Sequence, residues 1–382
     1  MMNITRSILL VFCLVAAFNL ISGTASAMNI FKNDFEKRWS ELSQDVKKLN
    51  EYTKIHPVEL RDVKAEGLKL EGVVFTDSTF SGVEWENVNA SKAVLTKVIF
   101  RKCKFIGGKW KDGILTDVIF EDCEFYDTSL SGCTVANIQF KNCKINHTGI
   151  GYLKGGKVEF EGCNWDMGAG GDSSCEFVFK NCTLGGISFS MMKNNVPILF
   201  EDTLLDEIDF YGSHFSTVTL RRVRQGEGGV YFNGVTAESI NFEDVDMLEG
   251  TGIGDATVGM VRIVGGQMYG PTFKKANIDK TYIRNAYVTR FALGNMGQVH
   301  VDNSTMHRSG FFQGGIDEFS ITNSTLDEIV GENFKANIVL WDNVTLDGKI
   351  DLTNAQVKDF RPTRLKRGPR LNLITTGSNM RF

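Results

Sequence analysis

The sequence predicts an all-β fold, a solenoid of short parallel strands, from two repeats in its first half. Three similar segments follow one another at a step of 20 residues: LTKVIFRKCKF, LTDVIFEDCEF and VANIQFKNCKI, which begin at Leu95, Leu115 and Val135. Large apolar residues also recur every five positions: Phe100, Phe105, Trp110, Leu115, Phe120, Phe125, Leu130, Val135, Phe140 and Ile145. A period of 20 built from four fives is typical of a solenoid in which each coil buries one residue per side.

The step of 20 continues far beyond these segments. One large apolar residue per coil, here called the anchor, recurs along the chain: Leu60, Phe80, Phe100, Phe120, Phe140, Phe160, Phe179, Phe200, Leu220, Phe242, Ile263, Ile283, Val301, Ile321, Trp341 and Phe360. These 16 anchors predict about 15 to 16 coils in one solenoid domain, residues 59–365. At the ~4.8 Å spacing of neighbouring strands, the rod is about 75 Å long.

The repeat resembles that of the pentapeptide-repeat family, in which an apolar residue every five is preceded by a small residue two positions earlier. The resemblance covers about residues 60–365 and is tightest from Phe75 to Ile145. It implies a right-handed quadrilateral parallel β-helix. After Ile145 the steps of five become irregular while the step of 20 persists, which predicts less regular turns, closer to the general parallel β-helix of polysaccharide-acting enzymes.

Composition agrees with an elongated β structure and excludes some partners. The 382 residues include only 5 Pro but 39 Gly and 28 Phe, as expected for many turns around a stacked core. The formal net charge is −4 and the pI about 5.9, far from the basic balance of proteins that bind nucleic acid. We therefore expect no nucleic-acid partner.

The first 27 residues have the features of a signal peptide. Arg6 precedes an apolar run over residues 8–20, and Ala25-Ser26-Ala27 forms a small-residue cleavage site. We expect cleavage after Ala27 and export to the periplasm or the cell exterior. The apolar run is short for a membrane span, so we expect no transmembrane segment in the mature chain.

Residues 28–58 are predicted to form an N-terminal cap. Apolar residues spaced by four or three predict one amphipathic helix from Asn29 to about His56: Phe31, Phe35, Trp39, Leu42, Val46 and Leu49. A solenoid must cover the unpaired edge of its first coil, which favours a capping role. The same spacing suits a short coiled-coil seam, so the alternative is a homodimer through this helix or through the coil ends.

Two polar patterns are interpreted as structural. The residue after each anchor alternates in sign along the rod, which places opposite charges in cross-strand register: Arg101, Glu121, Lys141, Glu161, Lys180, Glu201, Arg221 and Glu243. Asn303, Asn323 and Asn343 recur at one turn position, where asparagine suits a left-handed backbone. Each also lies in an Asn-x-Ser/Thr sequon, which carries a glycan only if the host adds one.

The cysteines predict a stacked core and no metal site. Five of them occupy one inward position on successive coils: Cys103, Cys123, Cys143, Cys163 and Cys182. Close pairs such as C-x-x-C are absent from the sequence, so neither a metal nor another cofactor is expected. Cys175, within a glycine-rich stretch, is predicted to be the exposed thiol.

A binding surface is predicted where glycine-rich turns gather on one side of the rod. If Phe210, Val230 and Phe311 point inward, the next residues, Tyr211, Tyr231 and Phe312, point outward. Tyr211 and Tyr231 are then expected to be neighbours on adjacent coils, in an exposed aromatic strip of the kind that carbohydrates and protein partners favour. These three residues are the predicted ligand-binding site.

Catalysis is the weaker interpretation. The richest local set of polar residues, Asp206, Glu207, Asp209, His214 and Arg222, has no recognisable catalytic order, and no catalytic residue is assigned. The last residues, 366–382, form a basic tail, for which a cap over the last coil and docking on an anionic surface are both open.

The sequence therefore predicts an exported, non-catalytic β-helix scaffold that binds a protein or glycan partner. The alternative is a polysaccharide-acting lyase or hydrolase on the same scaffold, distinguished by whether the region from Asp206 to His214 forms a cleft with convergent side chains.

Overall fold

A computed structural model describes residues 35–54, 56–193, 195–248, 250–273, 275–292, 295–311 and 315–382. The predicted signal peptide, residues 1–27, and the predicted site residue Phe312 lie outside the described residues. Among the helices that the structure describes, none has the length and apolar character needed to cross a bilayer.

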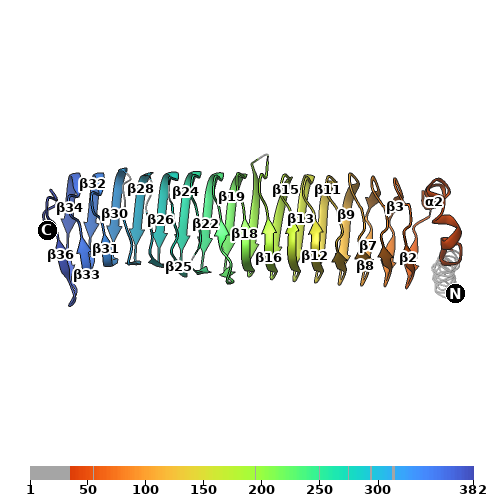
Figure 1. Cartoon of the computed structure of the whole chain (residues 1–382), viewed down its shortest axis with the longest axis horizontal. Coiled ribbons are helices and arrows are strands. Elements are labelled where there is room, and N and C mark those ends of the chain that lie inside the picture. Colours follow the sequence, from red (N-terminus) through yellow and green to blue (C-terminus); the bar gives the residue numbers. More distant parts are fainter. Residues whose placement is uncertain are drawn as a thin grey trace, which may run out of the picture.

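The chain is a long rod of stacked parallel coils with helices at its N-terminal end (Figure 1). Every strand pairing is parallel, and successive coils pair at a step of about 20 residues, as between Phe100 and Phe120. The predicted all-β parallel solenoid of about 15 coils is confirmed.

Each coil contributes to two parallel sheets that run along the rod. The first sheet contains β1 (Glu59–Arg61), β3 (Val74–Thr76), β4 (Thr79–Ser81), β6 (Val94–Thr96), β7 (Ile99–Arg101), β9 (Ile114–Glu121), β11 (Thr134–Lys141), β13 (Lys154–Glu161), β15 (Ser174–Lys180), β17 (Val196–Glu201), β19 (His214–Arg221), β22 (Thr236–Glu243), β24 (Thr257–Val264), β26 (Asn277–Arg284), β28 (Asn295–Asp302), β30 (Gly315–Thr322), β32 (Lys335–Asp342) and β34 (Gln356–Thr363).

The second sheet contains the shorter strands of the opposite side. They are β2 (Lys64–Glu66), β5 (Glu84–Glu86), β8 (Lys104–Ile106), β10 (Glu124–Tyr126), β12 (Lys144–Gly149), β14 (Asn164–Ala169), β16 (Thr183–Ser188), β18 (Leu204–Asp209), β20 (Arg224–Gln225), β21 (Val230–Tyr231), β23 (Asp246–Met247), β25 (Gln267–Tyr269), β27 (Tyr287–Thr289), β29 (Thr305–His307), β31 (Thr325–Val330), β33 (Thr345–Asp351), β35 (Lys366–Arg367) and β36 (Asn372–Ile374).

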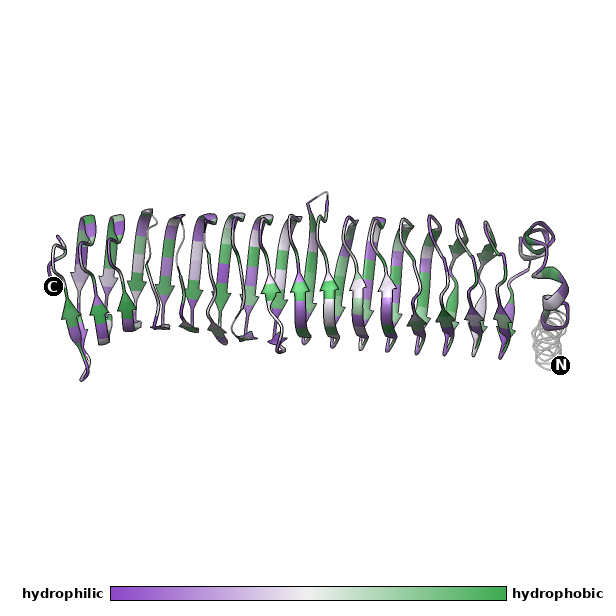
Figure 2. Cartoon of the chain, viewed as in Figure 1, coloured by the Kyte–Doolittle hydropathy of each residue, from purple (hydrophilic) through white to green (hydrophobic). Residues whose placement is uncertain are grey.

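The anchors form one continuous column in the core. All predicted anchors from Leu60 to Trp341 pair with each other in register. The last one is wrong, because Trp341 pairs with Pro362 and Phe360 pairs with Val339. Figure 2 shows apolar residues along the strands of the whole rod.

Aromatic stacking and buried thiols fill the first half of the core. Successive anchor rings from Phe80 to Phe200 stack with centroids 4.7–5.1 Å apart, close to the strand spacing. The five-residue cysteine ladder is buried, as predicted. Cys175, predicted to be exposed, is also buried, and desolvation raises the pKa of its thiol to about 12.

The polar patterns fix the register of the coils. The residues of the alternating charge row pair with one another, and Arg221 lies 3.4 Å from Glu201 and 2.8 Å from Glu243. Lys180 instead forms its ion pair with Glu159. The asparagine turns have the predicted left-handed backbone, with φ of 46°, 50° and 55° at Asn303, Asn323 and Asn343.

One corner of the coil changes along the rod. In the first coils this corner is held by a left-handed residue: Asp77, Lys97, Asp117 and Asn137. From Lys157 onward the residue at this corner no longer has a positive φ, while the strand continues through the corner, as in β26 and already in β9 and β11. The irregular steps of five after Ile145 have this structural counterpart.

The N-terminal end is covered by two helices rather than the single predicted helix. Residues 35–42 form the first, and α2 (Val46–Thr53) forms the second. The chain breaks between them because Asp45 caps α2, its side chain accepting hydrogen bonds from the backbone N–H of Lys47 and Lys48. Trp39 stacks on Trp85 of the second coil, with ring centroids 6.2 Å apart.

The C-terminal residues continue the solenoid. The strands β35 and β36 both pair in parallel with β33, so residues 366–374 lie along the last coil. Arg370 anchors this segment by pairing with Asp347 at 2.7 Å and Asp327 at 3.1 Å.

Candidate binding surfaces

The predicted aromatic strip is exposed but not continuous. Tyr211 is 59% exposed and Tyr231 is 37% exposed. The two residues lie on adjacent coils but two positions out of register, because Tyr231 pairs with Asp209. Phe210, Val230 and Phe311 are buried, as predicted, but the ring that stacks on Phe210, at 4.8 Å, is that of Phe232.

A glycine-rich insertion causes this shift. The anchors Leu220 and Phe242 are 22 residues apart, and the extra residues bulge at Gly226 to Gly229. The ring of Tyr231 folds over Gly229, where even a Cβ atom would lie 2.4 Å from the ring. Tyr231 therefore covers its own coil, and Tyr211 remains as an isolated exposed ring.

The polar set suggested for catalysis does not converge. Asp206, Glu207 and Asp209 belong to β18, whereas His214 begins β19 on the other sheet. Arg222 lies at the turn after β19 and binds Asp202, which lowers the pKa of that carboxyl. His214 and Arg222 line two different surface pockets, and no other member of the set lines either of them, so the set lacks the convergent side chains that the enzyme alternative requires.

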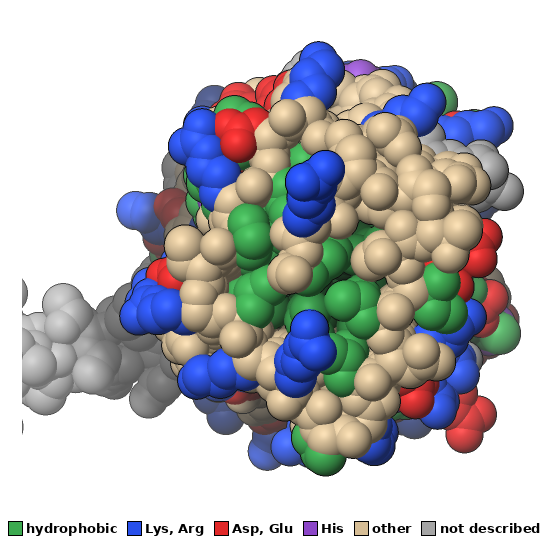
Figure 3. All heavy atoms as spheres, turned by 90° about the vertical axis from the view of Figure 1, so that its left-hand side faces the viewer, with side chains coloured by type: hydrophobic (Ala, Val, Ile, Leu, Met, Phe, Trp, Pro, Cys, Tyr) green, Lys and Arg blue, Asp and Glu red, His purple; other side chains and the backbone are tan. Residues whose placement is uncertain are grey.

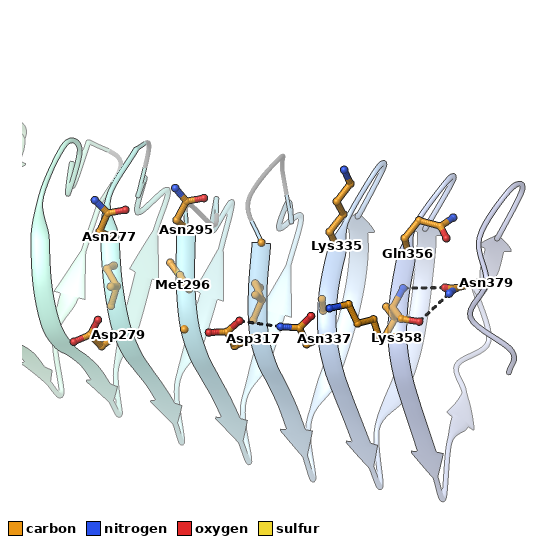
Figure 4. A pocket seen from close by; sticks show the side chains of 16 residues that line it. Asn277, Asp279, Asn295, Met296, Asp317, Lys335, Asn337, Gln356, Lys358 and Asn379 are labelled. Carbon is orange, nitrogen blue, oxygen red and sulfur yellow. Dashed lines mark hydrogen bonds between the residues drawn. The ribbon is translucent and has the colours of Figure 1, made fainter.

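The structure instead shows a groove that runs along the rod over β26, β28, β30, β32 and β34 (Figure 4). We call it the axial groove, and its volume is about 700 Å³. Its upper edge and lower edge are mainly polar, and its floor is apolar. The upper edge is Asn277, Asn295, Gly315, Lys335 and Gln356; the floor is Ile278, Met296, Ile316, Ala336 and Val357; the lower edge is Asp279, Gly297, Asp317, Asn337 and Lys358.

The three rows follow from the register of the strands. Asn277 pairs with Asn295, and Ile278 with Met296, so equivalent side chains of successive coils line up along the axis. The floor residues are at most 6% exposed because they belong to the core. The groove lies beside the corner that has lost its left-handed residue.

Small residues widen the middle of the groove. Gly297 is required, because a Cβ atom there would lie 2.6 Å from the carbonyl oxygen of Asp279. Gly315 is different, because a Cβ atom there would meet no heavy atom within 4 Å. The upper edge therefore has room for a side chain at position 315.

Some polar side chains of the groove are engaged within the chain and the others are available to a ligand. Gln356 donates to the carbonyl oxygen of Gly377 at 3.0 Å. Asn337 donates to Asp317 at 2.9 Å, and Asn379 closes one end by pairing with the backbone of Val357. Amides, carboxylates and amines in two facing rows supply hydrogen-bond donors and acceptors along an extended ligand. Within the described part of the chain, no cluster of three or more His, Cys, Asp or Glu is placed to hold a metal ion.

Sequence reasoning missed the axial groove. Its strands have an ordinary alternation of exposed and buried residues, as in Asn277, Ile278 and Asp279. The only signal was the irregular step of five in the second half, which marks the altered corner.

Family models match the first part of the solenoid. A model of pentapeptide repeats, in eight copies, matches residues 59–108, and a model of a pentapeptide repeat region matches residues 93–167. These are the coils with regular steps of five, and residues 59–167 are thus similar to the pentapeptide-repeat family. A search of curated proteins found no similar sequence.

The solved structures that match this chain have low sequence identity to it and low TM-scores. QnrB1, a plasmid-mediated fluoroquinolone resistance protein, is 15% identical and covers 47% of this chain and 91% of its own, with a TM-score of 0.37. HetL of Nostoc sp. strain PCC 7120, involved in heterocyst differentiation regulation, is 8% identical and covers 78% of this chain and 91% of its own, with a TM-score of 0.19. Tailspike protein 3 of bacteriophage CBA120 is 8% identical and covers 87% of this chain and 58% of its own, with a TM-score of 0.31. TM-scores this low support no conclusion about function.

Proposed function

We propose that this protein is an exported, non-catalytic β-helix scaffold that holds an extended glycan chain in the axial groove. The observation that carries the proposal is the groove itself, with two mainly polar edges and an apolar floor that repeat once per coil. The features of residues 1–27 support export, and the periplasm and the cell exterior are both compatible with them.

A glycan chain suits this arrangement for two reasons. The coil repeat of ~4.8 Å is comparable to the length of one sugar ring in an extended chain, so hydroxyl groups can meet a similar polar pair on each coil. The amides of Asn277 and Asn295 can both donate to and accept from hydroxyl groups. The floor residues Ile278 and Met296 are only 2–3% exposed, so the polar edges supply most of the contact surface.

The groove carries few charges and they are of both signs. Asp279 and Asp317 line one part of the lower edge, and Lys335 and Lys358 lie farther along the rod. A strongly anionic polymer would meet the two carboxylates unfavourably. The groove therefore favours a neutral or weakly charged glycan.

The test is binding of the purified protein to a broad panel of envelope and host glycans. Gly315→Phe fills the groove at a position that tolerates a Cβ atom, so we expect affinity to fall at least tenfold, which corresponds to about 1.4 kcal/mol. Gly315→Ala is the matched control and should bind like the natural protein. Tyr211→Ala with Tyr231→Ala should also bind normally.

Two other outcomes would contradict the proposal. Loss of binding in the tyrosine variant, with normal binding by Gly315→Phe, would move the site to the exposed tyrosines. A protein that binds no glycan on the panel would refute the glycan proposal, and a protein partner would then be the better hypothesis.

A second candidate, a polysaccharide hydrolase, is favoured by one observation. Asp279 and Asp317 line the same groove two coils apart, roughly 9–10 Å at the strand spacing, which is near the upper limit for the two carboxylates of inverting glycosidases. Both side chains are exposed, and Asp317 accepts a hydrogen bond from Asn337. Product release in the binding assay that is lost in Asp279→Asn would establish this alternative, and we expect no release.

A further inference from the structure

The C-terminal end of the rod exposes an apolar surface. Figure 3 views the molecule onto this end and shows apolar side chains gathered at its centre, with Lys and Arg side chains beside and around them. Phe360, Leu365, Leu371 and Leu373 are only partly buried, whereas the equivalent interior residues of earlier coils are nearly inaccessible. Phe382 packs on Phe360 at 5.0 Å and is still 40% exposed.

The backbone at this end is also open. Among the described residues, β34 pairs only with β32, and β35 and β36 pair only with β33. The edge of β34 is partly closed, because Asn379 bonds the N–H and the C=O of Val357, and Pro362 has no N–H. The outer edges of β35 and β36 present backbone N–H and C=O groups that another strand can use. The last coil is therefore an unpaired sheet edge beside an apolar surface.

Charge at this end is of one sign. From Phe360 to Phe382 the sequence has six Lys and Arg residues and no Asp or Glu. Arg361, Arg364 and Arg370 bind carboxylates of this chain. Lys366, Arg367 and Arg381 form no ion pair with a described residue and are exposed, so they are available to a partner.

The register excludes a second copy of this end as the occupant. Arg367 pairs with Leu346, in an inward column that Met306 and Leu326 fill in earlier coils. An arginine in this column places a positive charge over the centre of the end, where a further apolar coil would have to bury it. A symmetric contact between two such ends would also oppose Lys and Arg of one copy to those of the other.

We propose that the C-terminal end binds an acidic segment of a partner protein, which adds to the edge of β35 and β36 as a further strand of the second sheet. Alternating residues of such a strand would place apolar side chains on the exposed core and carboxylates near Lys366 and Arg367. Backbone pairing supplies affinity, and opposite charge selects the partner. This surface is distinct from the axial groove and does not depend on the glycan proposal.

The probe is a labelled peptide of alternating Glu and Val, tested against the purified protein together with a peptide of alternating Lys and Val. We expect saturable binding of the acidic peptide only, weakened at least tenfold by 0.5 M salt, because exposed charges are screened over less than about 10 Å. Hydrogen exchange should slow in β35 and β36 when the peptide binds.

Lys366→Glu with Arg367→Glu should abolish this binding. Lys109→Glu with Lys111→Glu is the matched control, because it makes the same change of charge at two exposed lysines between β8 and β9, far from this end. Equal binding of the basic peptide, or equal binding by the Lys366/Arg367 variant, would overturn the proposal. So would a concentration-dependent dimer in sedimentation that the acidic peptide dissociates, since a second copy would then occupy the end.

Discussion

Each end of the rod has a terminal coil with no neighbour on one side, and the two ends stabilise that coil with different interactions. At the N-terminal end the helices bury Phe35, Trp39, Leu42 and Leu49 against the first coils. At the C-terminal end the last strands are held by Arg–Asp pairs, and part of the apolar core remains exposed. The first end is closed by burial of apolar surface, and the second is left open but charged.

One device is common to both ends. Asn50 of α2 donates to the carbonyl oxygen of Gly72 and accepts from the N–H of Val74, at 2.9 and 2.8 Å. Asn379 makes the same pair of bonds with Val357, at 2.8 and 2.9 Å. At each end an asparagine amide thus stands in for the next strand. The two ends differ in the residues around this asparagine. Pairing the backbone groups of a terminal strand and covering its apolar core are therefore separate requirements.

The largest expected effect is at the closed end. Trp39→Ala removes a side chain that is 5% exposed, and we expect a loss of about 3–5 kcal/mol for the helix cap. Phe382→Ala, at the open end, should cost about 1 kcal/mol, because the ring is already partly in water.

The appropriate measurement is hydrogen exchange along the chain, because a solenoid need not unfold in one cooperative step. Faster exchange should be confined to α2 and the first coils in Trp39→Ala, and to the last coil in Phe382→Ala. Equal effects at the two ends would mean that the C-terminal end is as well covered as the N-terminal one.

The closed end was largely predictable from the sequence, except for its break. The apolar spacing from Phe35 to Leu49 runs through both helices and conceals the interruption, whereas the capping residue Asp45 marks it. The anchors were equally predictable, because a core that buries one residue per side of each coil forces the step of 20. The prediction was wrong at the last anchor, because an apolar pattern selects Phe360 over Pro362.

The candidate surfaces were harder to predict. A two-residue insertion before Phe232 shifts Tyr231 out of register, and nothing in the period of 20 reveals where such an insertion is absorbed. The axial groove depends on backbone conformation at one corner, which the residue types at Asn277 or Gly315 do not determine. The apolar surface at the open end requires knowing which residues have no further coil above them.

Low pH is expected to have a smaller effect, a loss of stability in the last coil at the open end. Hydrogen bonds from Arg364 and Thr363 lower the pKa of Asp342 to about 2, and Arg370 lowers the pKa of Asp347. A carboxyl whose folded pKa is depressed stabilises the fold above its unfolded pKa of about 4, and this contribution is lost as the pH falls through the folded value. We expect the last coil to loosen between pH 4 and 2, while the helix cap changes little.

Hydrogen exchange at pH 2 and pH 5, corrected for the intrinsic rates, tests this expectation. Asp342→Asn is the control variant, and its last coil should be looser at pH 5 and change less on acidification. Loosening of the helix cap before the last coil would contradict the assignment of ion pairs to one end and apolar burial to the other.

The smallest effect on stability is expected from a substitution at Arg367, the residue that keeps two C-terminal ends from associating. Arg367→Leu restores the apolar column of Leu326 and Leu346, so the free energy of unfolding should change by less than about 0.5 kcal/mol, as for an exposed residue. Its effect on association should be much larger, because inward-pointing charges on edge strands block pairing between sheet edges. Sedimentation velocity should show end-to-end dimers of Arg367→Leu at concentrations where the natural protein and the control Lys109→Leu, far from this end, stay monomeric. If Arg367→Leu also stays monomeric, Pro362 and the remaining Lys and Arg residues are sufficient to protect the edge, and the charge at position 367 serves the partner alone.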